Sequence, residues 1–153
     1  MVGLTLIRDA SRENAAMSAV HYDSYTAARE HLKDVLDTAE SGQVVTVRRD
    51  SATAAVLSAD RLRHLLASVV PSRVEVVAEA GEWSAFIPGL PVAAAAADYD
   101  ALIGDVVDAL REYAEDWPRL QRAPNHRENF GLVQLVSLSD DEELRRWITG
   151  SRE

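Results

Sequence analysis

The spacing of hydrophobic residues between Met17 and Val70 is the feature that most restricts how this chain can fold. Residues 18–22 predict a short strand. Residues 26–39 predict a helix, because their apolar side chains recur about every 3.6 residues and share one face. These side chains belong to Ala28, Leu32, Val35, Leu36 and Ala39. Gly42 follows them and supplies a stop signal for the helix.

Two aliphatic runs, at residues 44–48 and 53–57, flank the polar stretch Arg49-Asp50-Ser51-Ala52, which is typical of a hairpin. Ser58 then caps a second helix, whose apolar residues again keep helical spacing: Leu62, Leu65, Leu66 and Val69. The resulting β-α-β-β-α order spans about 55 residues, too few to bury a large core alone. We therefore expect dimerisation, with a dimer core of Leu32, Leu36, Val45 and Val56.

Charge divides the sequence at the place where this pattern ends. Pro71 disfavours helix at Val70, so a joint is expected over residues 68–73. Nine of the 16 Lys and Arg residues and nine of the 25 Asp and Glu residues lie up to Arg73. The net charge of −9 therefore falls entirely on the residues that follow, and a neutral half joined to an acidic half suggests two different tasks.

The first half resembles the Phd/YefM (prevent-host-death) antitoxin family over residues 17–70. The resemblance rests on the order and spacing of three segments, Ser24-Tyr25-Thr26-Ala27-Ala28-Arg29-Glu30-His31-Leu32, Val44-Val45-Thr46-Val47-Arg48-Arg49 and Ala54-Ala55-Val56-Leu57-Ser58. Such proteins are dimers that bind operator DNA through this domain and neutralise a toxin with the segment that follows. The resemblance implies that Arg29, Arg48 and Arg49 face DNA.

The chemistry of these residues is compatible with DNA binding. Arginine can bind a phosphate or a guanine edge with two hydrogen bonds, and hydroxyl groups at a helix start can donate to phosphate. The candidate DNA-binding residues are Ser24, Tyr25, Thr26, Arg29, Lys33, Arg48 and Arg49. The alternative is that Arg29 and Lys33 solvate a helix face beside Glu30 and Asp37, and that the arginine pair is an ordinary polar hairpin end.

The second half predicts a small α+β domain over residues 74–153. Residues 74–79 and 83–87 predict strands, an alanine run occupies residues 93–97, and residues 98–117 predict a long amphipathic helix. Residues 74–116 loosely resemble a HicB-like antitoxin domain. Residues 118–128 are expected to be irregular and residues 132–138 to form a strand. Ser139 to Glu142 predict a capping box for a final helix that ends at Gly150.

Four aromatic residues of this half are candidates for partner binding: Trp83, Phe86, Trp117 and Trp147. Tryptophan is enriched at the energetic centres of protein interfaces. The alternative is that aromatic residues on apolar stripes belong to the domain core.

Residue chemistry offers little support for catalysis. The chain has no cysteine, and its four histidines lie outside metal-binding or catalytic motifs, so we expect no enzyme activity, no metal and no cofactor. No apolar run approaches the length of a membrane span, so a cytoplasmic protein is expected. Residues 1–16 are interpreted as an N-terminal extension, because Met17 lies where the resemblance begins.

Together these features predict an α+β antitoxin of a type II toxin-antitoxin system. It would form a homodimer or a higher oligomer, repress its own operon and bind a toxin, for which a basic RelE/ParE-like ribonuclease suits the acidic half. The main alternative is a toxin-independent transcriptional regulator whose second domain binds a ligand or mediates oligomerisation. An enzyme with a degenerate nuclease-like second half comes third.

Overall fold

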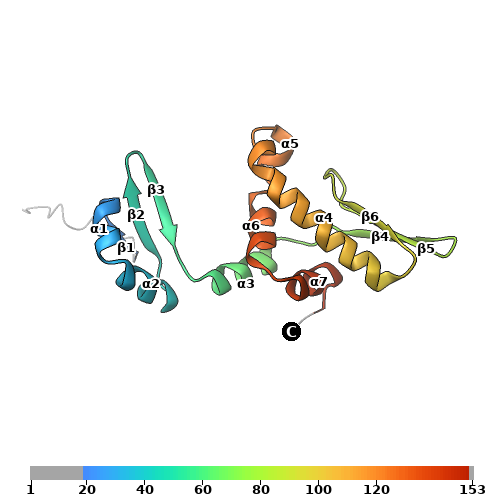
Figure 1. The fold of residues 1–153 in the computed structure, drawn as a ribbon, viewed down its shortest axis with the longest axis horizontal. Coiled ribbons are helices and arrows are strands. Elements are labelled where there is room, and N and C mark those ends of the chain that lie inside the picture. The colour runs from blue at the N-terminus through green and yellow to red at the C-terminus, as the bar shows by residue number, and fades with distance from the viewer. Residues whose placement is uncertain (1–18, 152–153) are drawn as a thin grey trace, which may run out of the picture. The chain divides into compact units, whose positions relative to one another are not determined.

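The computed structural model describes residues 19–151 and divides the chain into two compact units, one ending at Ser58 and one beginning at Ala59 (Figure 1). Both units combine helices with a three-stranded sheet, which confirms the mixed α+β class. The predicted N-terminal extension lies outside the described residues, as does Ser18, the first residue of the predicted opening strand.

The first unit contains β1 (Val20–Tyr22), α1 (Tyr25–Glu30), α2 (Leu32–Glu40), β2 (Val45–Arg49) and β3 (Ala52–Val56). β2 lies in the middle of the sheet, parallel to β1 and antiparallel to β3. The hairpin is close to its predicted position. Its tip includes Asp50 at φ +52°, a conformation that aspartate tolerates better than most residues.

The helix predicted at residues 26–39 is two helices that meet at His31. The backbone N–H of His31 donates to the carbonyl of Ala28, a tight turn that interrupts the α-helical pattern. The His31 ring also stacks on Tyr22, with ring centroids 6.1 Å apart. Hydrophobic periodicity did not reveal this break, because the apolar face continues through it.

The first unit has a very small core. Among its described residues only Ala28, Val35, Ala39 and Val45 are buried hydrophobics. These four side chains are short, so the apolar area they remove from water is modest.

The second unit begins with α3 (Ala59–Val69). Its sheet follows, with β4 (Glu75–Glu79), β5 (Glu82–Phe86) and β6 (Ala93–Ala96) antiparallel in that order. Four helices complete it: α4 (Tyr99–Leu120), α5 (Pro124–Arg127), α6 (Phe130–Leu138) and α7 (Asp141–Thr149). The β4–β5 turn places Ala80 and Gly81 at φ +53° and +85°.

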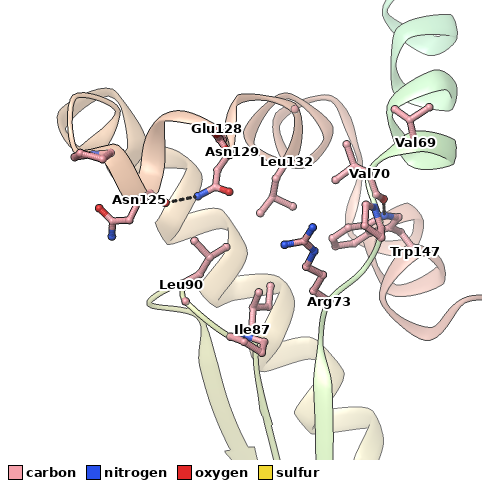
Figure 2. A pocket seen from close by; sticks show the side chains of 15 residues that line it. Val69, Val70, Arg73, Ile87, Leu90, Asn125, Glu128, Asn129, Leu132 and Trp147 are labelled. Carbon is pink, nitrogen blue, oxygen red and sulfur yellow. Dashed lines mark hydrogen bonds between the residues drawn. The ribbon is translucent and has the colours of Figure 1, made fainter.

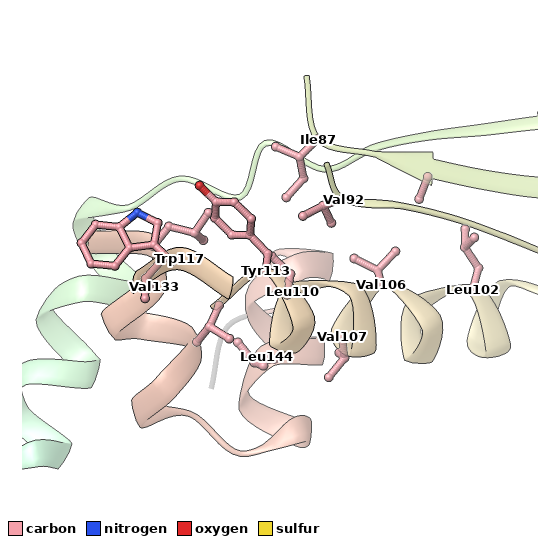
Figure 3. Close-up of a cluster of buried hydrophobic side chains, with 13 residues drawn as sticks. Ile87, Val92, Leu102, Val106, Val107, Leu110, Tyr113, Trp117, Val133 and Leu144 are labelled. Carbon is pink, nitrogen blue, oxygen red and sulfur yellow. The ribbon is translucent and has the colours of Figure 1, made fainter. Parts of the chain in front are cut away.

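The core of the second unit lies around α4 (Figure 3). One face of α4 buries a stripe that runs from Leu102 through Val106 and Leu110 to Tyr113 and Trp117. This stripe meets side chains from the sheet and from α6 and α7, among them Ala85, Ile87, Val92, Val133, Val136 and Leu144. The predicted long helix is therefore confirmed, and it extends three residues further, through Pro118, to Leu120.

The strand predicted at residues 132–138 was wrong, because this segment is helix α6. Its aliphatic residues favour a strand by propensity, but Leu132, Val133, Leu135 and Val136 are all buried, on more than one side of the helix. α6 packs against both α3 and α4, and this burial overrides the local preference.

Two smaller expectations for the second unit also need correction. Part of the segment expected to be irregular forms α5, and the alanine run, for which no element was predicted, forms strand β6. The capping box of α7 uses Asp140 and Glu143, one residue later than predicted, with both hydrogen bonds at 2.8 Å. Gly150 ends α7 in the left-handed conformation, as predicted.

The boundary between the units differs from the joint expected near Pro71. α3 packs on α6, and Arg63 of α3 forms an ion pair with Glu143 at 2.9 Å. The carbonyl of Val70 accepts a hydrogen bond of 2.9 Å from the indole N–H of Trp147. These contacts tie α3 and the segment after it to the second unit.

Candidate DNA-binding and partner-binding surfaces

Tyr25 and Arg29 form an exposed pair within the predicted DNA-binding set. They lie four residues apart on α1 and therefore share a face of that helix. The side chain of Tyr25 is 58% exposed, and Arg29 is exposed with no ion pair to the described residues. Thr26 is also exposed. Ser24 has a structural task as well, because its Oγ caps α1 by accepting from the N–H of Ala27 at 3.2 Å.

Lys33 is placed less favourably for binding DNA. Its ammonium forms an ion pair and a hydrogen bond with Asp37 one turn later on α2. This contact raises the pKa of Lys33 and balances its charge locally. The alternative expected from the sequence, a helix face whose charges pair with each other, therefore describes Lys33 better than Arg29.

The two strand-end arginines are exposed on opposite faces of the first sheet. Residues alternate along a strand, so Arg49 shares a face with the buried Val45, whereas Arg48 shares the other face with Thr46. The Nε of Arg48 donates to the carbonyl of Asp50 at 3.5 Å. The pair therefore cannot act as one flat cationic site.

Sequence reasoning missed His21, which lies on the same sheet face as Arg48. His21 is paired in register with Thr46, and its Nδ1 shares a hydrogen bond of 2.8 Å with the threonine hydroxyl. Its Nε2 lies 3.2 Å from a carboxylate oxygen of Asp23. The pairing of β1 with β2, which the sequence did not reveal, brings these groups together.

The predicted dimer core divides into two kinds of residue. Leu32 and Leu36 are 55% and 49% exposed, one turn apart on α2. Val56 is half-buried, and Val45 is fully buried within its own unit. Leu32 and Leu36 thus form an apolar surface, whereas Val45 has its contacts within one chain.

Of the four aromatic candidates for partner binding, Phe86 is the one classed as exposed, at 39%. Trp117 is buried, and its indole N–H donates to the carbonyl of His126 at 3.0 Å. Trp147 is held by its hydrogen bond to Val70, and the half-buried Trp83 packs edge-to-face against Tyr99 at 5.3 Å. Trp117 therefore belongs to the domain core, as the alternative interpretation expected, and Phe86 is the most accessible of the four candidates for contact with a partner.

The second unit also contains a cavity of about 520 Å³ (Figure 2). Its walls include Val70, Ile87, Leu90 and Leu132, and the side chain of Arg73 extends toward its middle. Arg73 has no ion pair to the described residues. Glu128, Asn125 and Asn129 also line the cavity, which therefore combines apolar walls with charged groups of both signs and suits a small ligand with hydrophobic and polar parts.

Neither a metal centre nor a membrane span is found in the part of the chain that the structure describes. Residues 19–151 contain no group of three or more His, Asp or Glu side chains arranged to hold a metal ion. No helix within the same range is both long and apolar enough to cross a bilayer.

Comparison with known proteins gives one informative similarity. No protein-family model matches the chain, and no curated protein sequence matches it. The fold is similar to a crystal structure from Syntrophomonas wolfei subsp. wolfei, described as the antitoxin part of a proposed toxin/antitoxin system. The TM-score is 0.71 at 20% identity, and the match covers 86% of this chain and 96% of that chain.

Proposed function

We propose that the chain is the antitoxin of a type II toxin-antitoxin system, which neutralises a protein toxin and represses its own operon. The observation that carries the proposal is the similarity to an antitoxin over nearly the full length of both chains. The sequence points the same way independently, because the Phd/YefM-like segments suggested an antitoxin without reference to any structure.

Operator binding is assigned to the first unit, acting as a homodimer. Support for the dimer comes from the four-residue core and from the solvent-facing pair Leu32 and Leu36. A second copy would cover this apolar surface and double the DNA-binding set around Tyr25 and Arg29. A two-fold dimer binds two half-sites, so the operator should be palindromic.

Toxin binding is assigned to the second unit. The residues after Arg73 carry the whole net charge of −9, which disfavours contact with DNA and attracts a basic protein. We infer a basic toxin of the RelE/ParE type for this reason. Among the four aromatic candidates, Phe86 is the most exposed and therefore the best placed to contact it.

Two experiments test this function. A gel-shift titration with DNA from upstream of the gene, at a series of salt concentrations, should give saturable binding that weakens with salt and exceeds binding to scrambled DNA. Co-expression with each neighbouring reading frame should identify one whose toxicity the chain abolishes. Scrambled DNA bound equally well would overturn the repressor role, and the absence of any neutralised frame would overturn the antitoxin role.

The cavity around Arg73 favours a second candidate function, a toxin-independent regulator that binds a small ligand. Its apolar walls, with Arg73 and Glu128 as charged groups of opposite sign, fit a small molecule with a hydrophobic body and a polar end. Stabilisation of the chain by such a molecule, lost in Arg73→Gln, together with operator binding but no toxin, would favour this candidate.

A further inference from the structure

Strand β6 is an unprotected edge of the second sheet. The strand order places β5 on one side of β6, and no other described strand pairs with its outer side. An edge strand offers backbone donors and acceptors to another chain, and proteins usually protect such edges with charged residues, proline or a bulge. All four residues of β6 are alanine, so their side chains provide no such protection.

A groove of about 330 Å³ lies where α4 packs alongside β6. It is lined by Ala93 and Ala94 of the strand and by Asp105, Asp108, Ala109 and Glu112 of the helix. The three carboxylates follow a spacing of three and four residues, which places them in a row on one helix face. No Lys or Arg lines this groove.

These carboxylates differ from others of the same helix in having no internal partner. Asp100 pairs with Arg145 at 3.0 Å, and Asp116 pairs with Arg119. Asp105, Asp108 and Glu112 form no ion pair or side-chain hydrogen bond with the described residues. Three unbalanced negative charges beside an unpaired edge are complementary to a cationic, extended peptide segment.

The geometry of strand and helix is compatible with such a segment. Alternate residues of an added strand lie about 6.8 Å apart, and successive turns of a helix about 5.4 Å apart. Every second side chain of the segment can therefore reach a different carboxylate, because the long side chains of Lys and Arg absorb the small mismatch.

We propose that the β6 edge and the acidic row Asp105, Asp108 and Glu112 form a docking groove for a basic β-strand of a partner protein. Backbone hydrogen bonds to β6 supply affinity, and alternating Lys or Arg residues supply specificity. This inference deepens the proposed toxin-binding function by naming a surface and a recognition mode, and its test uses neither toxin nor operator. Its failure would thus leave the antitoxin assignment untouched.

The test uses the full chain and a fluorescent heptapeptide of alternating arginine and valine, blocked at both ends. Fluorescence anisotropy at physiological salt should show saturable binding of this peptide to the unmodified chain. The triple variant Asp105→Asn, Asp108→Asn and Glu112→Gln should bind it at least about tenfold more weakly. The matched control, Glu75→Gln with Glu79→Gln and Glu82→Gln, removes the same charge elsewhere on the sheet and should change affinity less than about threefold. Equal losses in the two variants would show attraction to net charge alone and overturn the proposal.

Two further measurements test strand pairing directly. A peptide N-methylated at alternate residues keeps its charge but loses backbone donors, so its binding should weaken at least about tenfold; unchanged binding would overturn the proposal. In the unmodified chain, the normal peptide should slow amide hydrogen exchange in β6, and the absence of any slowing would contradict it. If amide hydrogen exchange in β6 becomes slower as the concentration of the chain rises, with no peptide present, the edge pairs with a second copy of this chain and the proposal is overturned.

Discussion

At the scale of single residues, the cations expected to bind DNA differ in how free they are to do so. Arg29 is exposed and has no described ion-pair partner, whereas Lys33 is paired with Asp37. A contact to DNA by Lys33 must first displace this pair. The net gain from Lys33 is therefore smaller than that from Arg29, although both residues carry one positive charge.

We predict that Arg29→Ala weakens operator binding by about 1–3 kcal/mol while the dimer stays intact, because it removes a forked contact to a base or a phosphate. Lys33→Ala is the matched control and should weaken binding less. Gel-shift titrations at fixed salt compare the two variants. Equal effects, or none for Arg29→Ala, would contradict the assignment of Arg29.

Tyr113 predicts how stability changes at alkaline pH. Burial raises the pKa of its hydroxyl, partly opposed by a hydrogen bond of 2.9 Å from Asn129. The folded chain thus holds this proton more tightly than the unfolded chain, whose tyrosine pKa is about 10. The resulting stabilisation is complete below that pH and is lost as the pH rises through the folded pKa.

The free energy of unfolding should therefore fall less steeply above about pH 10 in Tyr113→Phe than in the unmodified chain. Urea unfolding at several alkaline pH values measures this slope. An unchanged slope in Tyr113→Phe would show that Tyr113 does not cause the loss.

At the scale of elements, the apolar stripe of α2 is buried along one edge and exposed along the other. Val35 and Ala39 are buried, while Leu32 and Leu36 remain about half exposed. The hydrophobic period correctly placed all four on one broad stripe. It could not tell which part of the stripe faces its own sheet, because that depends on how α2 packs.

Replacing Leu32 and Leu36 with serine should shift the chain from dimer to monomer at micromolar concentration, because the apolar area that drives association is lost. Analytical ultracentrifugation measures the dissociation constant. Leu65→Ser, at a residue of α3 that is 55% exposed, is a control in the second unit. A dimer that persists unchanged in the double variant would exclude this face as the interface.

Helix α6 shows why part of the second unit escaped sequence analysis. A short run rich in leucine and valine fits a buried strand and a buried helix equally well when its hydrophobicity has no clear period. The surroundings decide, because α6 lies against both α3 and α4. The long amphipathic α4 and the cap at Gly150 were predictable, since each carries its own local signal.

Leu135→Ala should destabilise the second unit by about 2–5 kcal/mol, since it leaves a cavity beneath α6. Leu135 is 1% exposed, whereas Phe130 of the same helix is 57% exposed. Phe130→Ala should therefore cost clearly less. Thermal unfolding followed by circular dichroism compares them, and a similar loss in both would contradict the packing of α6.

At the scale of the whole molecule, the sequence pattern and the packing of α3 place the boundary between the two units at different positions. The Phd/YefM-like pattern assigns the helix after the hairpin to the first half, and α3 packs in the second unit. Leu65 and Val69 of α3 are nonetheless 55% and 63% exposed, so this helix retains an apolar face. Sequence alone could not divide the chain, because the apolar stripe of α3 does not reveal which unit covers it.

We predict that a fragment starting at Ala59 unfolds at a higher temperature than one starting at Val74. The shorter fragment lacks α3, which exposes the surface of α6 beneath it and removes the ion pair between Arg63 and Glu143. Calorimetry measures the unfolding temperatures of the two fragments. Arg63→Ala in the longer fragment shows how much of the difference comes from the ion pair alone. Equal melting temperatures would mean that α3 adds nothing to the second unit.

The four-residue core of the first unit would make the proposed operator binding sensitive to the concentration of the chain. Fifteen hydrophobic residues are buried among the described residues of the second unit, against four in the first, so the two units should differ widely in intrinsic stability. If pairing with another copy supplies what the first unit lacks, its folded fraction follows mass action. Dilution below the dissociation constant would then open it to proteases, so a fall in synthesis would be amplified into rapid loss of operator binding.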